Sequence, residues 1–173
     1  MKYMIASDIH GSAFYCRKLL EAFEASGANR LVLLGDILYH GPRNDLPKEY
    51  APKEVLAMLN GCKDRIYCVR GNCDTEVDQM VLEFPVMADY ALLAMDGITI
   101  YATHGHVYHE NHLPPMQKGD VLLHGHTHPG GSVRGYYHLK SRLRIHTEGR
   151  QSADIRDFGG WGLSDPGFRG PRD

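Results

Sequence analysis

Histidine and acidic side chains gather directly after short apolar segments of this chain. The densest group follows residues 121–123, where the sequence reads H-G-H-T-H and places three histidines within five residues. Asp8 and His10 follow an apolar segment near the amino terminus in the same way. Carboxylate and imidazole groups are the usual protein ligands of divalent transition metals. The pattern therefore predicts a metal centre.

Seven residues in such positions are candidate ligands: Asp8, His10, Asp36, Asn72, His104, His126 and His128. This mixture of oxygen and nitrogen donors suits Mn²⁺, Fe²⁺ or Zn²⁺ better than a structural cysteine site does. Seven ligands with one bridging carboxylate would hold two ions roughly 3.5 Å apart, the spacing of two-metal phosphoryl-transfer sites. Such ions neutralise a phosphodiester and lower the pKa of a bound water, so that it can attack phosphorus near neutral pH.

A repeated order of strand, polar loop and helix is expected to position these residues. Apolar periodicity predicts strands at 2–6, 30–34 and 66–69, with helices at 12–25 and 53–59. This rhythm is typical of a parallel sheet, in which functional groups collect beyond the carboxyl ends of the strands. A hairpin is predicted at 91–95 and 98–102 around Asp96-Gly97, and a further strand at 121–123.

The motifs D-x-H, G-D, G-N-x-D, H-G and G-H-T-H occur in this order at the predicted strand ends. In these motifs, and in the longer segments G-D-I-L-Y-H-G-P-R-N and R-G-N-C-D-T-E-V-D-Q-M, the chain resembles the calcineurin-like metallophosphoesterase superfamily and its small YfcE-type bacterial phosphodiesterases. The resemblance covers residues 1–128. It implies an α/β fold, a four-layer αββα sandwich, and an enzyme that hydrolyses a small phosphodiester by attack of metal-bound water.

The resemblance also implies a role for each candidate ligand. Asp8, His10 and His128 would hold one ion, Asn72, His104 and His126 the other, and Asp36 would bridge the two. Asn72 would also face the phosphate. Two Mn²⁺ ions are expected, with Fe²⁺, Zn²⁺ and Ni²⁺ as alternatives, and the protein is expected to form homo-oligomers.

One position departs from the pattern of many relatives. They carry a histidine after the asparagine, where it binds phosphate and protonates the leaving group, whereas this chain has Cys73. A thiol supplies no comparable cationic acid. We therefore expect either a preference for substrates with good leaving groups or a proton donor from elsewhere, for which His40 is the candidate.

Other interpretations of the same residues stay open at this point. Asp8, Asp36 and Asp74 could each cap a helix, the usual role of an aspartate after a strand. Alternative functions are a phosphomonoesterase or nucleotide phosphatase, a metal-free interaction scaffold, and an inactive product of a damaged reading frame. The remaining histidines of the site region, His106, His109, His112 and His124, are not assigned to the metal centre.

Composition excludes several classes of protein. With 173 residues and a formal net charge of −2, the chain has the size of one domain and no basic surplus for nucleic-acid binding. No apolar run reaches the ~18 residues of a membrane span, and no secretory signal is recognisable. The four cysteines include no C-x-x-C pair, so we expect reduced thiols and a cytoplasmic protein.

The character of the chain changes after His128. Residues 129–173 contain nine of the 19 glycines, and no clear helical or strand pattern is present. Read one base later with permitted synonymous codons, this segment yields an aliphatic strand and an N-P-G-S turn, as the resemblance would continue. We therefore expect a domain at 1–128, whose final strands are lost or disordered, and an out-of-frame tail at 129–173 in which His138 and His146 have no role.

Overall fold

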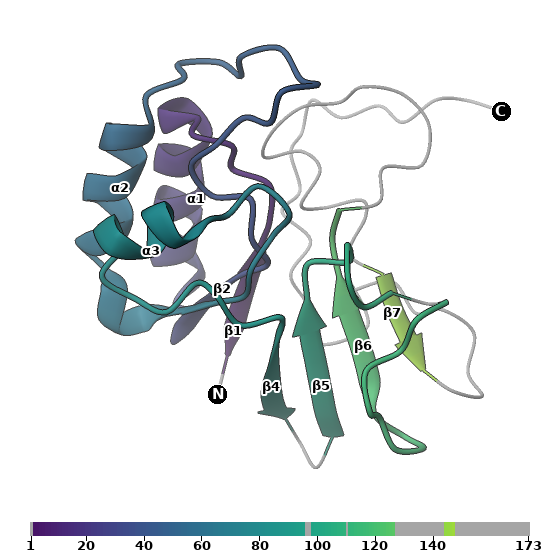
Figure 1. The fold of residues 1–173 in the computed structure, drawn as a ribbon. Coiled ribbons are helices and arrows are strands. Elements are labelled where there is room, and N and C mark those ends of the chain that lie inside the picture. Colours follow the sequence, from purple (N-terminus) through teal and green to yellow (C-terminus); the bar gives the residue numbers. More distant parts are fainter. Residues whose placement is uncertain (1, 96–97, 110, 127–143, 148–173) are drawn as a thin grey trace, which may run out of the picture.

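The computed structural model describes residues 2–95, 98–109, 111–126 and 144–147. They form two stacked β-sheets with helices on the outer side of the first sheet (Figure 1). The first sheet is parallel, has the order β1-β2-β3, and consists of β1 (Tyr3–Ala6), β2 (Arg30–Leu33) and β3 (Ile66–Cys68).

The second sheet has the order β4-β5-β6-β7. Its strands β4 and β5 form the predicted hairpin, β5 and β6 are parallel, and β6 and β7 are antiparallel. Its members are β4 (Tyr90–Met95), β5 (Ile98–Thr103), β6 (Val121–His124) and β7 (Arg144–Thr147).

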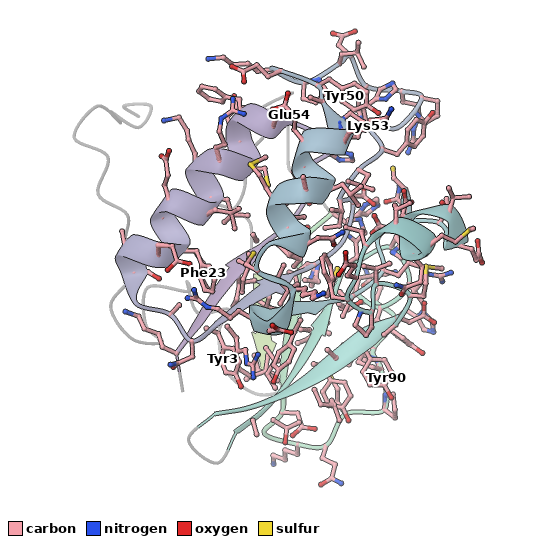
Figure 2. All side chains as sticks on the ribbon, turned by 90° about the vertical axis from the view of Figure 1, so that its left-hand side faces the viewer. Tyr3, Phe23, Tyr50, Lys53, Glu54 and Tyr90 are labelled. Carbon is pink, nitrogen blue, oxygen red and sulfur yellow. The ribbon has the colours of Figure 1, made fainter. Side chains whose placement is uncertain are left out.

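Two of the helices lie close to where apolar periodicity places them. These are α1 (Ala13–Ser26) and α2 (Pro52–Asn60), and the structure adds the 3-10 turn η1 (Lys63–Arg65) and α3 (Glu76–Val81). Ser12 caps α1 by accepting a hydrogen bond from the Tyr15 N–H at 3.3 Å, and Gly27 ends the helix with φ 64°. Phe23, labelled in Figure 2, is fully buried against the first sheet.

Strand β2 separates two hydrophobic cores because its side chains alternate in direction. Leu31 and Leu33 pack with the helices, whereas Val32 and Leu34 pack with the second sheet. On the other side of this second core lie Leu93, Ile100, Ala102, Val121 and Leu123. The layers are therefore helix, sheet and sheet, and the predicted α/β class with two stacked sheets is confirmed. Among the described residues, no helix covers the outer face of the second sheet.

Besides η1, one helix and one strand were not predicted from the sequence. Helix α3 has only six residues and begins at a capping box, in which the Thr75 N–H donates to Asp78 Oδ2 at 2.7 Å. Strand β7 lies in the segment for which no strand was expected, and its backbone pairs with β6. The rest of the predicted out-of-frame tail, including His138, lies outside the described residues. None of the helices that the structure describes is long and apolar enough to cross a membrane.

Candidate metal centre

The candidate ligands collect at the carboxyl ends of five strands. Asp8 and His10 follow β1, Asp36 follows β2 and Asn72 follows β3, while His104 and His126 follow β5 and β6 of the second sheet. Parallel pairing within each sheet brings these ends to one edge. The hydrogen bond from His104 Nδ1 to the Leu34 carbonyl oxygen, at 2.6 Å, joins the two edges. The stacking of the sheets therefore creates one site from both of them.

Four of these residues have a strained backbone. Asp8, His10, Asp36 and His126 have φ values of 59°, 50°, 57° and 62°. Among the described non-glycine residues, only Glu49 shares this left-handed region. Such conformations are uncommon outside glycine and cluster at functional sites. The backbone is thus bent at several strand ends in a way that directs polar side chains to one place.

Asp36 lies between the two halves of the cluster. Its Oδ2 atom is 3.6 Å from His10 Nε2 and also 3.6 Å from His104 Nε2. Its other oxygen, Oδ1, accepts a hydrogen bond from the Cys73 N–H at 2.8 Å. One carboxylate oxygen is therefore held by the backbone, and the other faces both histidines. This is the geometry that a bridging carboxylate needs.

The second half of the cluster is built around His104, which is fully buried. Its Nε2 atom lies 3.1 Å from Asn72 Oδ1 and 2.9 Å from His126 Nδ1. Its Nδ1 donates to the carbonyl of Leu34, so Nε2 is the ring atom that faces Asn72 and His126. Imidazole, amide and carboxylate groups thus converge on one place, where they could hold a cation.

His10 is held in the same way on the other side of Asp36. Its Nδ1 donates to the Tyr39 carbonyl oxygen at 2.7 Å, and its Nε2 lies 3.5 Å from Asp8 Oδ1. A hydrogen bond from one ring nitrogen to a carbonyl fixes the tautomer and leaves the other nitrogen for a metal. Both histidines therefore present Nε2 to the space next to Asp36.

The separations between donor atoms fit metal coordination. With metal–ligand bonds of about 2.0–2.2 Å, neighbouring ligand atoms are about 3.0–3.5 Å apart in octahedral or tetrahedral geometry. The measured separations around His10, Asp36, His104 and His126 run from 2.9 to 3.6 Å. Two groups that could hold an ion, His10–Asp36–Cys73 and Asp36–His104–His126, share Asp36. Among the described residues, two overlapping groups could therefore each hold a metal ion.

The pKa values of His10 and Asp8 also indicate that positive charge is favoured beside Asp36. Burial alone would lower the pKa of His10, but Asp8, the Tyr39 carbonyl and Asp36 raise it to about 9. Burial alone would raise the pKa of Asp8, but His10 and His104 bring that pKa well below its usual value. Positive charge is therefore favoured between these carboxylates, and a proton on His10 occupies the place that a cation would take.

Asp74 holds the loops that carry the ligands. Its carboxylate accepts hydrogen bonds from the N–H groups of Asp36 and Gly71 at 2.7 Å and of Ile37 at 2.9 Å. It therefore ties the loop after β2 to the loop after β3. The helix caps of α1, α2 and α3 are Ser12, Ala51 and Thr75, so no aspartate of this site caps one of these helices. The sequence identified Asp74 only as the last residue of G-N-x-D.

Cys73 joins the first group as an uncharged thiol. Its Sγ atom accepts a hydrogen bond from Asn72 Nδ2 at 3.2 Å. Burial and the nearby carboxylate of Asp36 raise its pKa to about 12. The side chain at this position is therefore a neutral thiol near pH 7, neither a thiolate nor a cationic acid.

The structure places the other predicted residues less centrally. His40 contacts Tyr39 and Tyr50, with ring centroids 4.9 and 5.2 Å away, and its buried Nδ1 has no hydrogen-bond partner among the described residues. His128 lies outside the described residues. An open hollow lined by Ala28, Asn29, Arg30 and Arg65 lies at the opposite end of β2 and contains none of the candidate ligands.

Two histidines left unassigned by sequence reasoning are close to the ligands. His106 packs edge-on against His104, with ring centroids 5.3 Å apart, and lies 6.3 Å from the ring of His126. His124 is fully buried. It follows Leu123, which faces the core between the sheets, so its side chain points to the opposite face of β6. The only signal for His106 was its position two residues after His104.

Comparisons with known proteins agree with this geometry. The Calcineurin-like phosphoesterase superfamily domain matches residues 1–135, a range that contains every candidate ligand. Phosphodiesterase YfcE of Escherichia coli strain K12 is 48% identical over 136 residues, which are 78% of this chain and 74% of that protein. Its counterpart from E. coli O157:H7 has the same identity and coverage. A solved structure of Yfce, described as a phosphoesterase from E. coli, has a TM-score of 0.70 at 48% identity, covering 72% of this chain and 69% of that one.

Proposed function

Because the chain belongs to the calcineurin-like phosphoesterase superfamily, we propose that its metal centre is the active site of a phosphodiesterase that requires two divalent ions. The observation that carries this proposal is Asp36, whose Oδ2 is 3.6 Å from a histidine on each side. When bound, two such ions neutralise the phosphodiester, lower the pKa of a water and stabilise charge on the leaving oxygen.

The residues divide the work as follows. Asp8 and His10 would hold the first ion, together with His128 as the resemblance implies. His104, His126 and Asn72 would hold the second, and Asp36 would belong to both. Asn72 is exposed beside the buried His104, so its amide can also orient the phosphate. Mn²⁺ is the proposed native ion, because carboxylate, carboxamide and imidazole donors suit it without a thiolate.

The proposed metal ligands do not include a residue that protonates the leaving group. Cys73 lies where a cationic acid would be useful, and its thiol is neutral. We expect Cys73→His to raise kcat for substrates with poor leaving groups more than for those with 4-nitrophenolate. Unchanged rates on both kinds of ester would remove the proposed role of this position.

His40 is the proposed alternative donor. It lies one residue beyond Tyr39, whose carbonyl holds His10. If it protonates the leaving group, His40→Gln should slow esters of alcohols by a larger factor than esters of 4-nitrophenol. Equal slowing of both would assign it a supporting role instead.

The central test combines metal dependence with one matched pair of variants. The protein is freed of metal with a chelator and then assayed with and without Mn²⁺ on bis(4-nitrophenyl) phosphate and on the corresponding monoester. We expect activity only with the ion, a higher rate on the diester, and loss of both activity and Mn²⁺-induced thermal stabilisation in Asp36→Asn. Asp64→Asn removes an exposed carboxylate from η1 and serves as the control. Full activity in the presence of chelator would refute the proposal, and a faster monoester would identify a phosphomonoesterase.

The reading frame of residues 129–173 and the oligomeric state of the protein are also proposals. We propose a shift of reading frame between His128 and Pro129, supported by the change in composition after His128. Resequencing the gene decides this, because an unchanged upstream frame running through Asp173 would contradict it. The homo-oligomer expected from the resemblance is checked by sedimentation velocity.

A further inference from the structure

The loop after β2 forms a wall beside the metal centre. The Tyr39 carbonyl accepts the hydrogen bond of His10 Nδ1 at 2.7 Å, so Tyr39 is directly bonded to a proposed ligand. Two residues later, a Cβ atom on Gly41 would lie 3.4 Å from Cys73 Sγ. The segment 39–41 therefore runs along the side of the site that contains His10 and Cys73.

The Tyr39 side chain is the outermost member of a stack of three rings. It meets His40 edge-to-face at 4.9 Å and 70°, and His40 meets Tyr50 at 5.2 Å and 75°. Tyr50, labelled in Figure 2, is fixed by close packing on Gly11, where a Cβ atom would be only 2.5 Å from the tyrosine ring. The stack is thus anchored to the loop that carries His10.

Among the described residues, the ring of Tyr39 contacts the ring of His40 and keeps part of its surface accessible. Tyr39 remains 42% exposed, whereas most aromatic surface of a folded domain is buried. The Tyr39 backbone borders the proposed metal centre, and its ring is held against His40, so an aromatic group on a bound phosphate ester could stack on this ring without a large loss of side-chain freedom. Stacking of this kind contributes about 1–3 kcal/mol per base in nucleic-acid-binding proteins.

We propose that Tyr39 is the specificity-determining residue of this enzyme and selects phosphodiesters that carry an aromatic ring, either a nucleobase or an aryl group. The inference rests on the proposed phosphodiesterase function, because the metal centre must hold the phosphate while Tyr39 contacts the ring. It does not require the ring to be the leaving group.

Binding measurements test this without turnover. Calorimetry on the Mn²⁺-loaded protein would give dissociation constants for inorganic phosphate, methyl phosphate, phenyl phosphate and thymidine 5′-monophosphate. In the wild type, at least one aromatic ligand should bind about 5- to 140-fold more tightly than methyl phosphate. The phenyl and thymidine ligands distinguish an aryl from a nucleoside preference.

Three variants complete the experiment. Tyr39→Phe should keep the preference, and Tyr39→Leu should reduce it to less than about threefold while inorganic phosphate binds as before. Tyr67→Leu is the matched control, because Tyr67 is 39% exposed but lies on β3, where its ring contacts Arg30. No aromatic preference in the wild type, or an unchanged one in Tyr39→Leu, would overturn the inference. Failure of the wild type to bind inorganic phosphate would instead refute the proposed metal-centre function.

Discussion

Gly71 is the residue at which a single methyl group should disable the metal centre. It follows β3 and lies against Asp36, the carboxylate shared by both halves of the site. A Cβ atom at this position would overlap Asp36 Oδ1 and lie 2.8 Å from the carboxylate carbon. Gly71→Ala therefore displaces the carboxylate of Asp36, while the identity of every proposed ligand residue stays the same.

The size of the effect follows from the required displacement. Carbon atoms in contact are about 3.5–4.0 Å apart, so the Asp36 carboxylate would have to move by about 1 Å. A misplacement of about 1 Å can cost roughly 100-fold in rate, or about 2.7 kcal/mol of transition-state stabilisation. Overpacking of a closely packed site also costs about 1–3 kcal/mol in folding stability.

The assay compares Gly71→Ala with Gly61→Ala, which follows α2 and whose Cβ atom would lie 3.3 Å from the Met58 carbonyl oxygen, a contact that needs a shift of only a few tenths of an ångström. We expect kcat/KM on bis(4-nitrophenyl) phosphate to fall about 100-fold or more in Gly71→Ala, and its thermal stabilisation by Mn²⁺ to shrink. Gly61→Ala should leave both unchanged. Wild-type kcat/KM together with full Mn²⁺ stabilisation in Gly71→Ala would show that Asp36 is not a fixed bridging ligand.

Three further predictions concern the supports of the site and its core. Asp74→Ala removes the acceptor of three backbone N–H groups, so it should lower Mn²⁺ affinity about 10- to 100-fold, as measured by titration calorimetry; unchanged affinity would contradict the clamp. Leu123→Ala opens a cavity between the sheets and should cost about 2–5 kcal/mol of unfolding free energy in urea. Leu92→Ala, at a side chain that is 56% exposed, should cost clearly less, and equal losses would refute the proposed core. Cys16 and Cys68 should resist labelling by a thiol reagent in the native protein, because burial raises the pKa of both thiols; rapid native labelling of either would show that its core opens.

Local sequence was enough to predict most of the elements that build this domain. Apolar periodicity located α1 and the strands of the first sheet, because a buried face repeats with the period of the helix or strand. Gly27 ended α1 as expected, with the left-handed conformation that glycine adopts easily. Elements without a strong pattern were missed. Helix α3 is too short for periodicity to show, and β7 forms by pairing with β6.

The ligand types and their order along the chain were likewise readable from the sequence. Carboxylate, carboxamide and imidazole after successive strands indicate a divalent metal site, because parallel strands deliver their carboxyl ends to one edge. The family comparison agrees with the superfamily suggested by those motifs. The assignment of all seven residues as metal ligands stays a prediction, as do the roles of Cys73 and His40.

Only the tertiary structure could decide how these residues meet. The two sheets are joined at the site through His104 and Leu34, which are separated by seventy residues of sequence. That contact places His104 opposite His10 across Asp36, and no local pattern encodes it. The clamp formed by Asp74 and the exposed ring of Tyr39 are also consequences of loops packing together. The sequence by itself determined which atoms could bind metal, because side-chain chemistry is local; the packing of the sheets decided the distances, because these depend on contacts between distant segments.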